Sequence, residues 1–150
     1  MKNTEGDGGV SIKYFEDFTL GEVFETLPYA VTAGEITAFA AQYDPQPFHL
    51  PGAADLIASG WQTASLNMRL FVTCGWFNPP PGALGLGVKD LRWHRPVRPG
   101  DSIRVRITVV ELRVSSSNPQ NGILTTSFVT LNQRDEEVQT MVSSVLLGRR

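Results

Sequence analysis

The sequence predicts an α+β fold, because helical patterns are confined to the first half of the chain and strand patterns dominate the second half. In the first half, two segments combine capping residues with apolar positions at helical spacing. In the second half, four segments alternate between apolar and polar residues, which is typical of strands with one buried face. We therefore expect an antiparallel sheet that lies against one long buried helix.

The composition is that of a single globular domain. The 150 residues include 13 Lys and Arg against 15 Asp and Glu, and 41% of them are hydrophobic. A chain of this size forms one core, so we expect a flexible N-terminus over residues 1–12 and a single domain over residues 13–150. The net charge of -2 gives no general reason to bind nucleic acid or a membrane surface. No stretch approaches the roughly 20 apolar residues of a membrane helix, so we expect a soluble, cytoplasmic protein.

The first helix is predicted to begin after Thr32, which has the spacing of a capping box with Glu35. A short strand within residues 21–31 precedes it. Pro45 ends this helix, because the residue before a proline is pushed out of the α region. The apolar residues of the segment share one face, which we expect to pack inward: Ile36, Phe39, Ala40 and Tyr43.

The second helix is predicted to begin after Ser59, which has capping-box spacing with Gln62. No proline follows until Pro79, and apolar residues occur on most sides of the helix. Such a helix is expected to be buried. Three consecutive prolines then indicate a loop. The four strands are expected within residues 86–97, 101–114, 122–134 and 136–150.

The segment "YDPQPFH", from Tyr43 to His49, carries the residues most suited to chemistry. Asp44 and His49 flank a turn whose two prolines restrict the backbone, so both side chains can face one water molecule. One group can then act as a base while the other acts as an acid. A turn aspartate and a partly buried histidine without a catalytic role is the alternative explanation of this pattern.

The order of these features resembles that of the MaoC-like dehydratases, relatives of the (R)-specific enoyl-CoA hydratases. The resemblance spans nearly the whole chain from about Tyr14, and its most specific parts are the signature Asp44, Gln46, Pro47 and His49 and the turn "RPVRPGD" from Arg95 to Asp101. It implies a hotdog fold, in which a curved antiparallel sheet wraps around one long central helix. Members usually assemble as dimers through a continued sheet, so a homodimer or a multiple of dimers is expected.

The resemblance also implies a hydratase or dehydratase that acts on enoyl or (R)-3-hydroxyacyl thioesters of coenzyme A or acyl carrier protein. Asp44 and His49 would activate water and protonate the substrate, while Gly60 would offer an N–H at a helix N-terminus to the thioester oxygen. Further substrate-binding residues are expected at these positions: Gln46, Ser59, Trp61, Arg92 and Arg95. No cofactor is expected beyond the carrier of the substrate. No metal site is expected either, because the chain has two histidines and one cysteine.

Three alternatives stay open at the level of sequence. Hotdog proteins also include acyl-CoA thioesterases, in which a carboxylate activates water at the carbonyl. A non-catalytic subunit that only binds acyl thioesters is a further possibility, because the segment between His49 and Gly60 is shorter than in most members and carries Pro51 and Gly52 where an acidic residue is usual. The arginines could instead form a solvated strand face and play no part in substrate binding.

Overall fold

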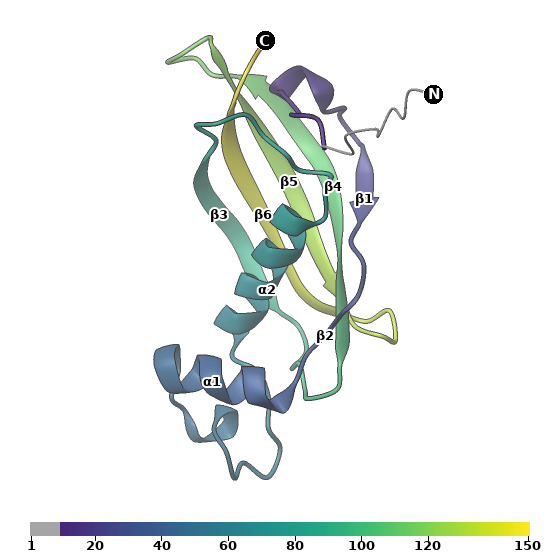
Figure 1. Ribbon diagram of the computed structural model, residues 1–150, viewed down its shortest axis with the longest axis vertical. Coiled ribbons are helices and arrows are strands. Elements are labelled where there is room, and N and C mark those ends of the chain that lie inside the picture. The colour runs from purple at the N-terminus through teal and green to yellow at the C-terminus, as the bar shows by residue number, and fades with distance from the viewer. Residues whose placement is uncertain (1–9) are drawn as a thin grey trace, which may run out of the picture.

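A curved sheet packs along helix α2 (Gly60–Thr73) in the computed structural model, which describes residues 10–150 (Figure 1). The described strands are β1 (Val23–Glu25), β2 (Tyr29–Ala30), β3 (Leu84–Trp93), β4 (Ser102–Val114), β5 (Asn121–Leu131) and β6 (Glu137–Gly148). The described helices also include α1 (Ala33–Tyr43) and two short 3-10 helices, Phe15–Asp17 and Pro47–His49. Of the predicted flexible start, residues 1–9 lie outside the described part of the chain.

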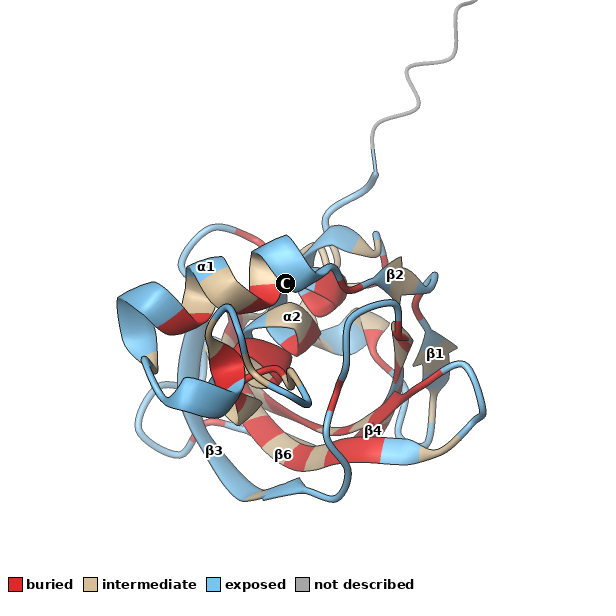
Figure 2. Ribbon diagram, turned by 90° about the horizontal axis from the view of Figure 1, so that it is seen from below, coloured by how far each residue is buried: buried red, intermediate tan, exposed pale blue. Residues whose placement is uncertain are grey.

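The strands form one antiparallel sheet in the order β1-β4-β5-β6-β3, and β2 pairs with the beginning of β4. The three long strands β4, β5 and β6 are neighbours, and β3 lies at the edge beside β6. Figure 2 shows this sheet curving around α2, with many buried residues along β4 and β6. The predicted α+β fold is confirmed, and the wrapping of a curved sheet around one long helix is the hotdog arrangement.

The core lies between α2 and the inner face of the sheet. Along β4 every second side chain points inward, and these four are at most 1% exposed: Ile103, Val105, Ile107 and Val109. The C-terminal half of α2 packs Phe71 edge-on against Phe128 of β5, with ring centroids 5.0 Å apart. This alternation is what the strand pattern in the sequence predicted.

Helix α1 begins at the predicted capping box. The Glu35 N–H donates to the Thr32 hydroxyl at 3.2 Å, and the Thr32 N–H donates to the Glu35 carboxylate at 3.3 Å. Ile36 and Ala40 are buried as expected. The prediction for Tyr43 was wrong, because its side chain is 65% exposed. The last turn of α1 presents this ring to solvent, where it packs against Phe39 with centroids 5.1 Å apart.

Helix α2 begins where it was predicted, but its buried face is not the apolar one over the first two turns. The Ser59 hydroxyl caps the helix by accepting the Trp61 N–H at 3.2 Å. The expected burial on most sides is wrong, because Trp61 is 58% exposed and Val72 is 49% exposed. The buried face of the N-terminal half is instead polar, and its members are Gln62, Thr63 and Asn67. The helix therefore turns apolar residues to the surface and polar ones to the interior over its first two turns.

The edge strand β3 also exposes apolar side chains. Its residues are exposed almost throughout, as the pale blue ribbon of Figure 2 shows. The large apolar side chains exposed on α2 and β3, which we call the apolar edge, are Trp61, Met68, Val72, Leu84, Leu86, Val88 and Trp93. Large exposed apolar areas are uncommon on monomeric proteins and mark surfaces that bind partners.

Candidate functional site

The turn after α1 brings Asp44 and His49 together. Asp44 is the C-cap of α1, with its N–H bound to the Ala40 carbonyl at 2.9 Å, and His49 ends the 3-10 helix Pro47–His49. The Oδ2 atom of Asp44 lies 3.3 Å from Nε2 of His49. The His49 side chain is 6% exposed and that of Asp44 is 17% exposed, so the pair is largely sheltered but can be reached from solvent.

The other ring nitrogen of His49 fixes how the pair holds its protons. Nδ1 lies 2.6 Å from the Ile57 carbonyl oxygen, which can only accept, so Nδ1 carries a hydrogen and donates it. Nε2 therefore faces Oδ2 of Asp44, and the 3.3 Å between these two atoms is short enough for a proton to pass between the two groups.

The pKa of Asp44 lies below its usual value. The largest cause is the side-chain hydrogen bond from Ser59, followed by that from Gln46, and the charge of His49 acts in the same direction, while burial opposes them. The Gln46 amide donates to Oδ1 of Asp44 at 2.6 Å. Asp44 is therefore held in its ionised form, which is the form that can accept a proton from water.

We expect Asp44 to stabilise the fold at neutral pH and to lose this effect in acid. Because its folded pKa is lowered, the stabilisation is fully present above the unfolded pKa of about 3.9 and is lost as the pH falls through the lower folded pKa. Replacing Ser59 by alanine removes the largest cause and should raise the pKa of Asp44 in a carboxyl carbon NMR titration. Ser65→Ala is the matched control, because that hydroxyl donates to the Trp61 carbonyl and should leave the titration unchanged. An unaltered Asp44 titration in S59A would contradict the assignment.

Gly60 lies beside this pair as the first residue of α2. Its N–H has no partner within the helix, and among the described residues no other backbone carbonyl accepts it. Gly60 also contacts Trp93, because a Cβ atom at this position would lie 2.6 Å from Cδ2 of that indole. The absence of a side chain is thus required here by the packing of Trp93 against the helix start.

The shortened segment between His49 and Gly60 is tied to its surroundings at several points. The Ile57 N–H donates to the Phe48 carbonyl at 3.1 Å, and the Ala58 N–H donates to the Val97 carbonyl at 2.8 Å. Asp55 receives two hydrogen bonds of 2.9 Å from the guanidinium of Arg98, at the exposed side of the segment. The two backbone contacts hold the Ile57 carbonyl at His49 and place Gly60 next to this histidine.

A cavity of about 270 Å³ is lined by His49, Ile57 and Gly60, but not by Asp44. It lies between the 3-10 helix, the start of α2 and the end of β3, and its wall includes His49, Gly60, Thr63, Trp93, His94 and Arg95. No Asp or Glu is among the described residues that line this cavity. A ligand in this cavity would contact His49, the free N–H of Gly60 and the basic side chains His94 and Arg95, while Asp44 lies behind His49 and outside the lining.

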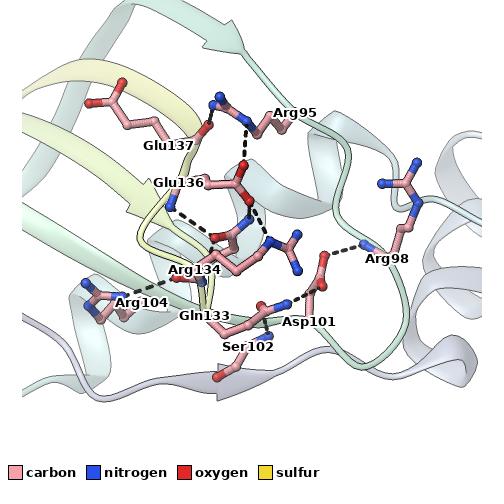
Figure 3. A network of polar contacts seen from close by, with 10 residues as sticks. Arg95, Arg98, Asp101, Ser102, Arg104, Gln133, Arg134, Glu136 and Glu137 are labelled. Atoms are coloured by element: carbon pink, nitrogen blue, oxygen red, sulfur yellow. Dashed lines mark hydrogen bonds and ion pairs between the residues drawn. The ribbon is translucent and has the colours of Figure 1, made fainter.

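The remaining predicted substrate-binding residues are distributed around this cavity. Arg95 is in its wall and is held there by the β5–β6 turn, because it donates to the Glu137 carbonyl at 3.0 Å and pairs with Glu136 at 3.3 Å (Figure 3). Trp61 lies behind the wall, edge-on against Trp93 with centroids 5.1 Å apart. Arg92 is exposed on β3 opposite Thr140 and is outside the cavity lining.

The predicted site residues did not include three side chains that line this cavity, namely Thr63, Trp93 and His94. His94 is exposed on the surface as well. Its Nε2 lies 2.7 Å from the Thr140 hydroxyl. The position of "RWHRP" directly before the motif "VRPGD" is the signal that could have drawn attention to Trp93 and His94.

The sequence of residues 17–132 matches the family described as the MaoC like domain. This chain belongs to that family. A solved MaoC-like dehydratase from Rhodospirillum rubrum is 41% identical, with a TM-score of 0.83 over 92% of this chain and 98% of that one. An (R)-hydratase from A. caviae, described as involved in PHA biosynthesis, is 27% identical, with a TM-score of 0.68 over 87% of this chain and 97% of that one.

A curated relative is a longer protein, of which this chain matches only a part. A mesaconyl-CoA hydratase from Cereibacter sphaeroides is 30% identical over 146 residues, which is 92% of this chain. The chain spans 42% of the length of that relative. In the part of this MaoC-like protein that the structure describes, none of the helices has the length and apolar character needed to cross a membrane.

Proposed function

We propose that this MaoC-like protein is a hydro-lyase that adds water to a trans-2-enoyl thioester and, in reverse, removes water from the (R)-3-hydroxyacyl thioester. The observation that carries the proposal is the 3.3 Å contact between Asp44 and His49 beside the unpartnered N–H of Gly60. The family and the two relatives whose names include hydratase support the same reaction class.

The geometry supports a mechanism in which the pair both takes and gives a proton. The thioester oxygen accepts the Gly60 N–H, which stabilises the charge that grows on this oxygen as the water oxygen bonds to C3. One member of the pair takes the proton released by water, and the other gives a proton to C2, where the electrons of the double bond form the new C–H bond. Transfer of the proton between Oδ2 and Nε2 then restores the starting state. Atoms and charge balance without a further reactant.

We propose coenzyme A or the phosphopantetheine of acyl carrier protein as the carrier. Arg95 supports this, because it lines the cavity, is half exposed and keeps guanidinium N–H groups beyond those bound to Glu136 and Glu137. Arg92 lies further along β3, where the exposed guanidinium would meet a more distant phosphate.

We propose a homodimer, or a multiple of dimers, in the cytoplasm. The exposed edge strand β3 supports this assembly, because an unpaired strand edge can pair with the same strand of a second copy. The apolar edge would be covered in the same contact. Burial of these side chains would also explain why α2 carries apolar residues on the face that is exposed in one chain.

The activity is tested by the loss of the ultraviolet absorbance of an enoyl thioester after the protein is added. Short-chain, medium-chain and branched enoyl-CoA esters should be screened, and a decrease without release of free thiol is the expected result. Release of thiol without prior hydration would indicate a thioesterase instead. An Asp44→Ala, His49→Ala double variant is the control, and normal turnover by this variant would sink the proposal.

A further inference from the structure

The interior beneath the first two turns of α2 is polar. Its members come from one face of α2 and from two paired positions of the sheet, and each is at most 4% exposed: Gln62, Thr63, Asn67, Thr130 and Gln139. We call this set the polar layer. Thr130 and Gln139 lie opposite each other on β5 and β6, and the Thr130 hydroxyl donates to the Asn67 side chain at 3.3 Å. The interior beneath the C-terminal half of α2 is aromatic and aliphatic, as Phe71 and Phe128 show.

The polar layer contains hydrogen-bonding groups that are not satisfied. The indole N–H of Trp93 donates to Oε1 of Gln139 at 2.9 Å. Because an indole N–H can only donate, this bond fixes the orientation of the amide and leaves its NH₂ group as a free donor. Within the described residues, Gln139 Nε2, Asn67 Nδ2 and Gln62 Oε1 have no partner. Buried polar groups are almost always paired, so these three atoms are positions at which a polar group of a ligand can form hydrogen bonds.

The polar layer adjoins the cavity of the candidate site. Thr63 belongs to both, and Trp93 lines the cavity while it binds Gln139 behind it. The same wall carries His94 and Arg95, which can supply positive charge. The guanidinium of Arg95 thus lies in the cavity wall, and the free amide donors of Gln139 and Asn67 lie behind Thr63 and Trp93, outside the lining.

We infer that the acyl group of the substrate is short and ends in a carboxylate, as in a fumaryl-type thioester. The inference rests on the proposed function and names its substrate class. A carboxylate oxygen would accept the free N–H groups of Gln139 and Asn67, with Arg95 offsetting its charge. A purely aliphatic chain would leave these donors unpaired and cover polar surface with methylene groups.

The first test compares two substrates that differ only at the far end. Fumaryl-CoA carries a carboxylate where crotonyl-CoA carries a methyl group. The native protein is expected to hydrate fumaryl-CoA with a kcat/KM at least about a hundredfold higher, since sites built to bond a polar group strongly reject analogues that lack it. Equal values, or a preference for crotonyl-CoA, would overturn the inference and leave the proposed hydratase function standing.

The second test uses Gln139→Leu, which keeps the volume of the side chain and removes the free NH₂ group. The preference for fumaryl-CoA over crotonyl-CoA should fall by about tenfold or more. A purely structural effect would lower both activities in proportion and leave the ratio unchanged, which would count against the inference. Thr126→Val is the matched control, because it removes another buried, unpartnered hydroxyl from β5, outside the polar layer, and should leave the ratio unaltered.

A binding measurement decides the inference if the native protein hydrates neither ester. In that outcome the proposed function fails, and calorimetric titration with freshly prepared succinyl-CoA and with butyryl-CoA compares the same carboxylate and methyl ends without any reaction. Tighter binding of succinyl-CoA by about tenfold or more supports the inference. Equal binding of the two esters overturns it.

Discussion

Replacing Asp44 by asparagine is expected to lower kcat/KM for hydration of an enoyl thioester by about a thousandfold. Asparagine has nearly the same shape and keeps an oxygen that can accept the Gln46 amide bond, but it takes no proton from water. It also cannot exchange a proton with His49 across the 3.3 Å between Oδ2 and Nε2. The measurement is the initial rate of loss of the enoyl absorbance at several substrate concentrations.

The fold should be preserved in this variant, because the backbone contact from Asp44 to Ala40 that ends α1 does not involve the side chain. A circular dichroism spectrum like that of the native protein serves as the check that the fold is intact, because denaturant unfolding would also record the loss of the stabilisation by the Asp44 carboxylate. Asp55→Asn is the matched control, since Asp55 is an acid of the same region that binds the exposed guanidinium of Arg98. A rate near that of the native protein in D44N would rule out Asp44 as the proton-transferring group.

Replacing Gly60 by alanine is expected to damage both stability and activity. The added methyl group would lie 2.6 Å from Cδ2 of Trp93, so the indole or the start of α2 must move. Overpacking of this kind costs about 1–3 kcal/mol of unfolding free energy. Displacing the N–H that we propose as the donor to the thioester oxygen should reduce kcat by about a hundredfold. Denaturant unfolding and steady-state kinetics measure the two effects separately.

Gly34→Ala is the matched control for this variant. Gly34 also lies in the first turn of a helix, but a Cβ atom there meets nothing within 4 Å, so alanine should be neutral or slightly stabilising. The double variant Gly60→Ala, Trp93→Leu separates the two roles of the glycine. It should recover stability by relieving the overlap, and full recovery of activity as well would show that the Gly60 N–H does not contribute to catalysis.

The local parts of this structure were predictable from sequence. The capping box at Thr32 and the alternation along β4 depend on neighbouring residues, so short patterns reported them correctly. The proximity of Asp44 and His49 could also be predicted, because a single turn brings the two side chains together. The sequence alone could not place Ile57 or Trp93, since their contacts with His49 and Gly60 depend on how distant segments pack.

The second helix shows why a correct pattern led to a wrong conclusion. Apolar residues on most sides of α2 predicted burial on most sides, yet Trp61 and Val72 are exposed while Asn67 is fully buried. Periodicity reports how many apolar faces a helix has but does not say whether each one packs against the same chain or against another. Polar side chains such as Asn67 are tolerated inside only where they bond to a partner, and the sequence contains no signal for that partner.

The orientation of His49 depends on an atom that no side-chain substitution can remove. The group that accepts the Nδ1 hydrogen is the main-chain carbonyl of Ile57, at 2.6 Å. A mutational scan would therefore record position 57 as tolerant to conservative replacements such as valine or leucine, even though its backbone sets the tautomer of the reacting imidazole. In this protein, a map of functional importance drawn from substitutions alone would leave out one of the contacts on which the proposed proton transfer depends.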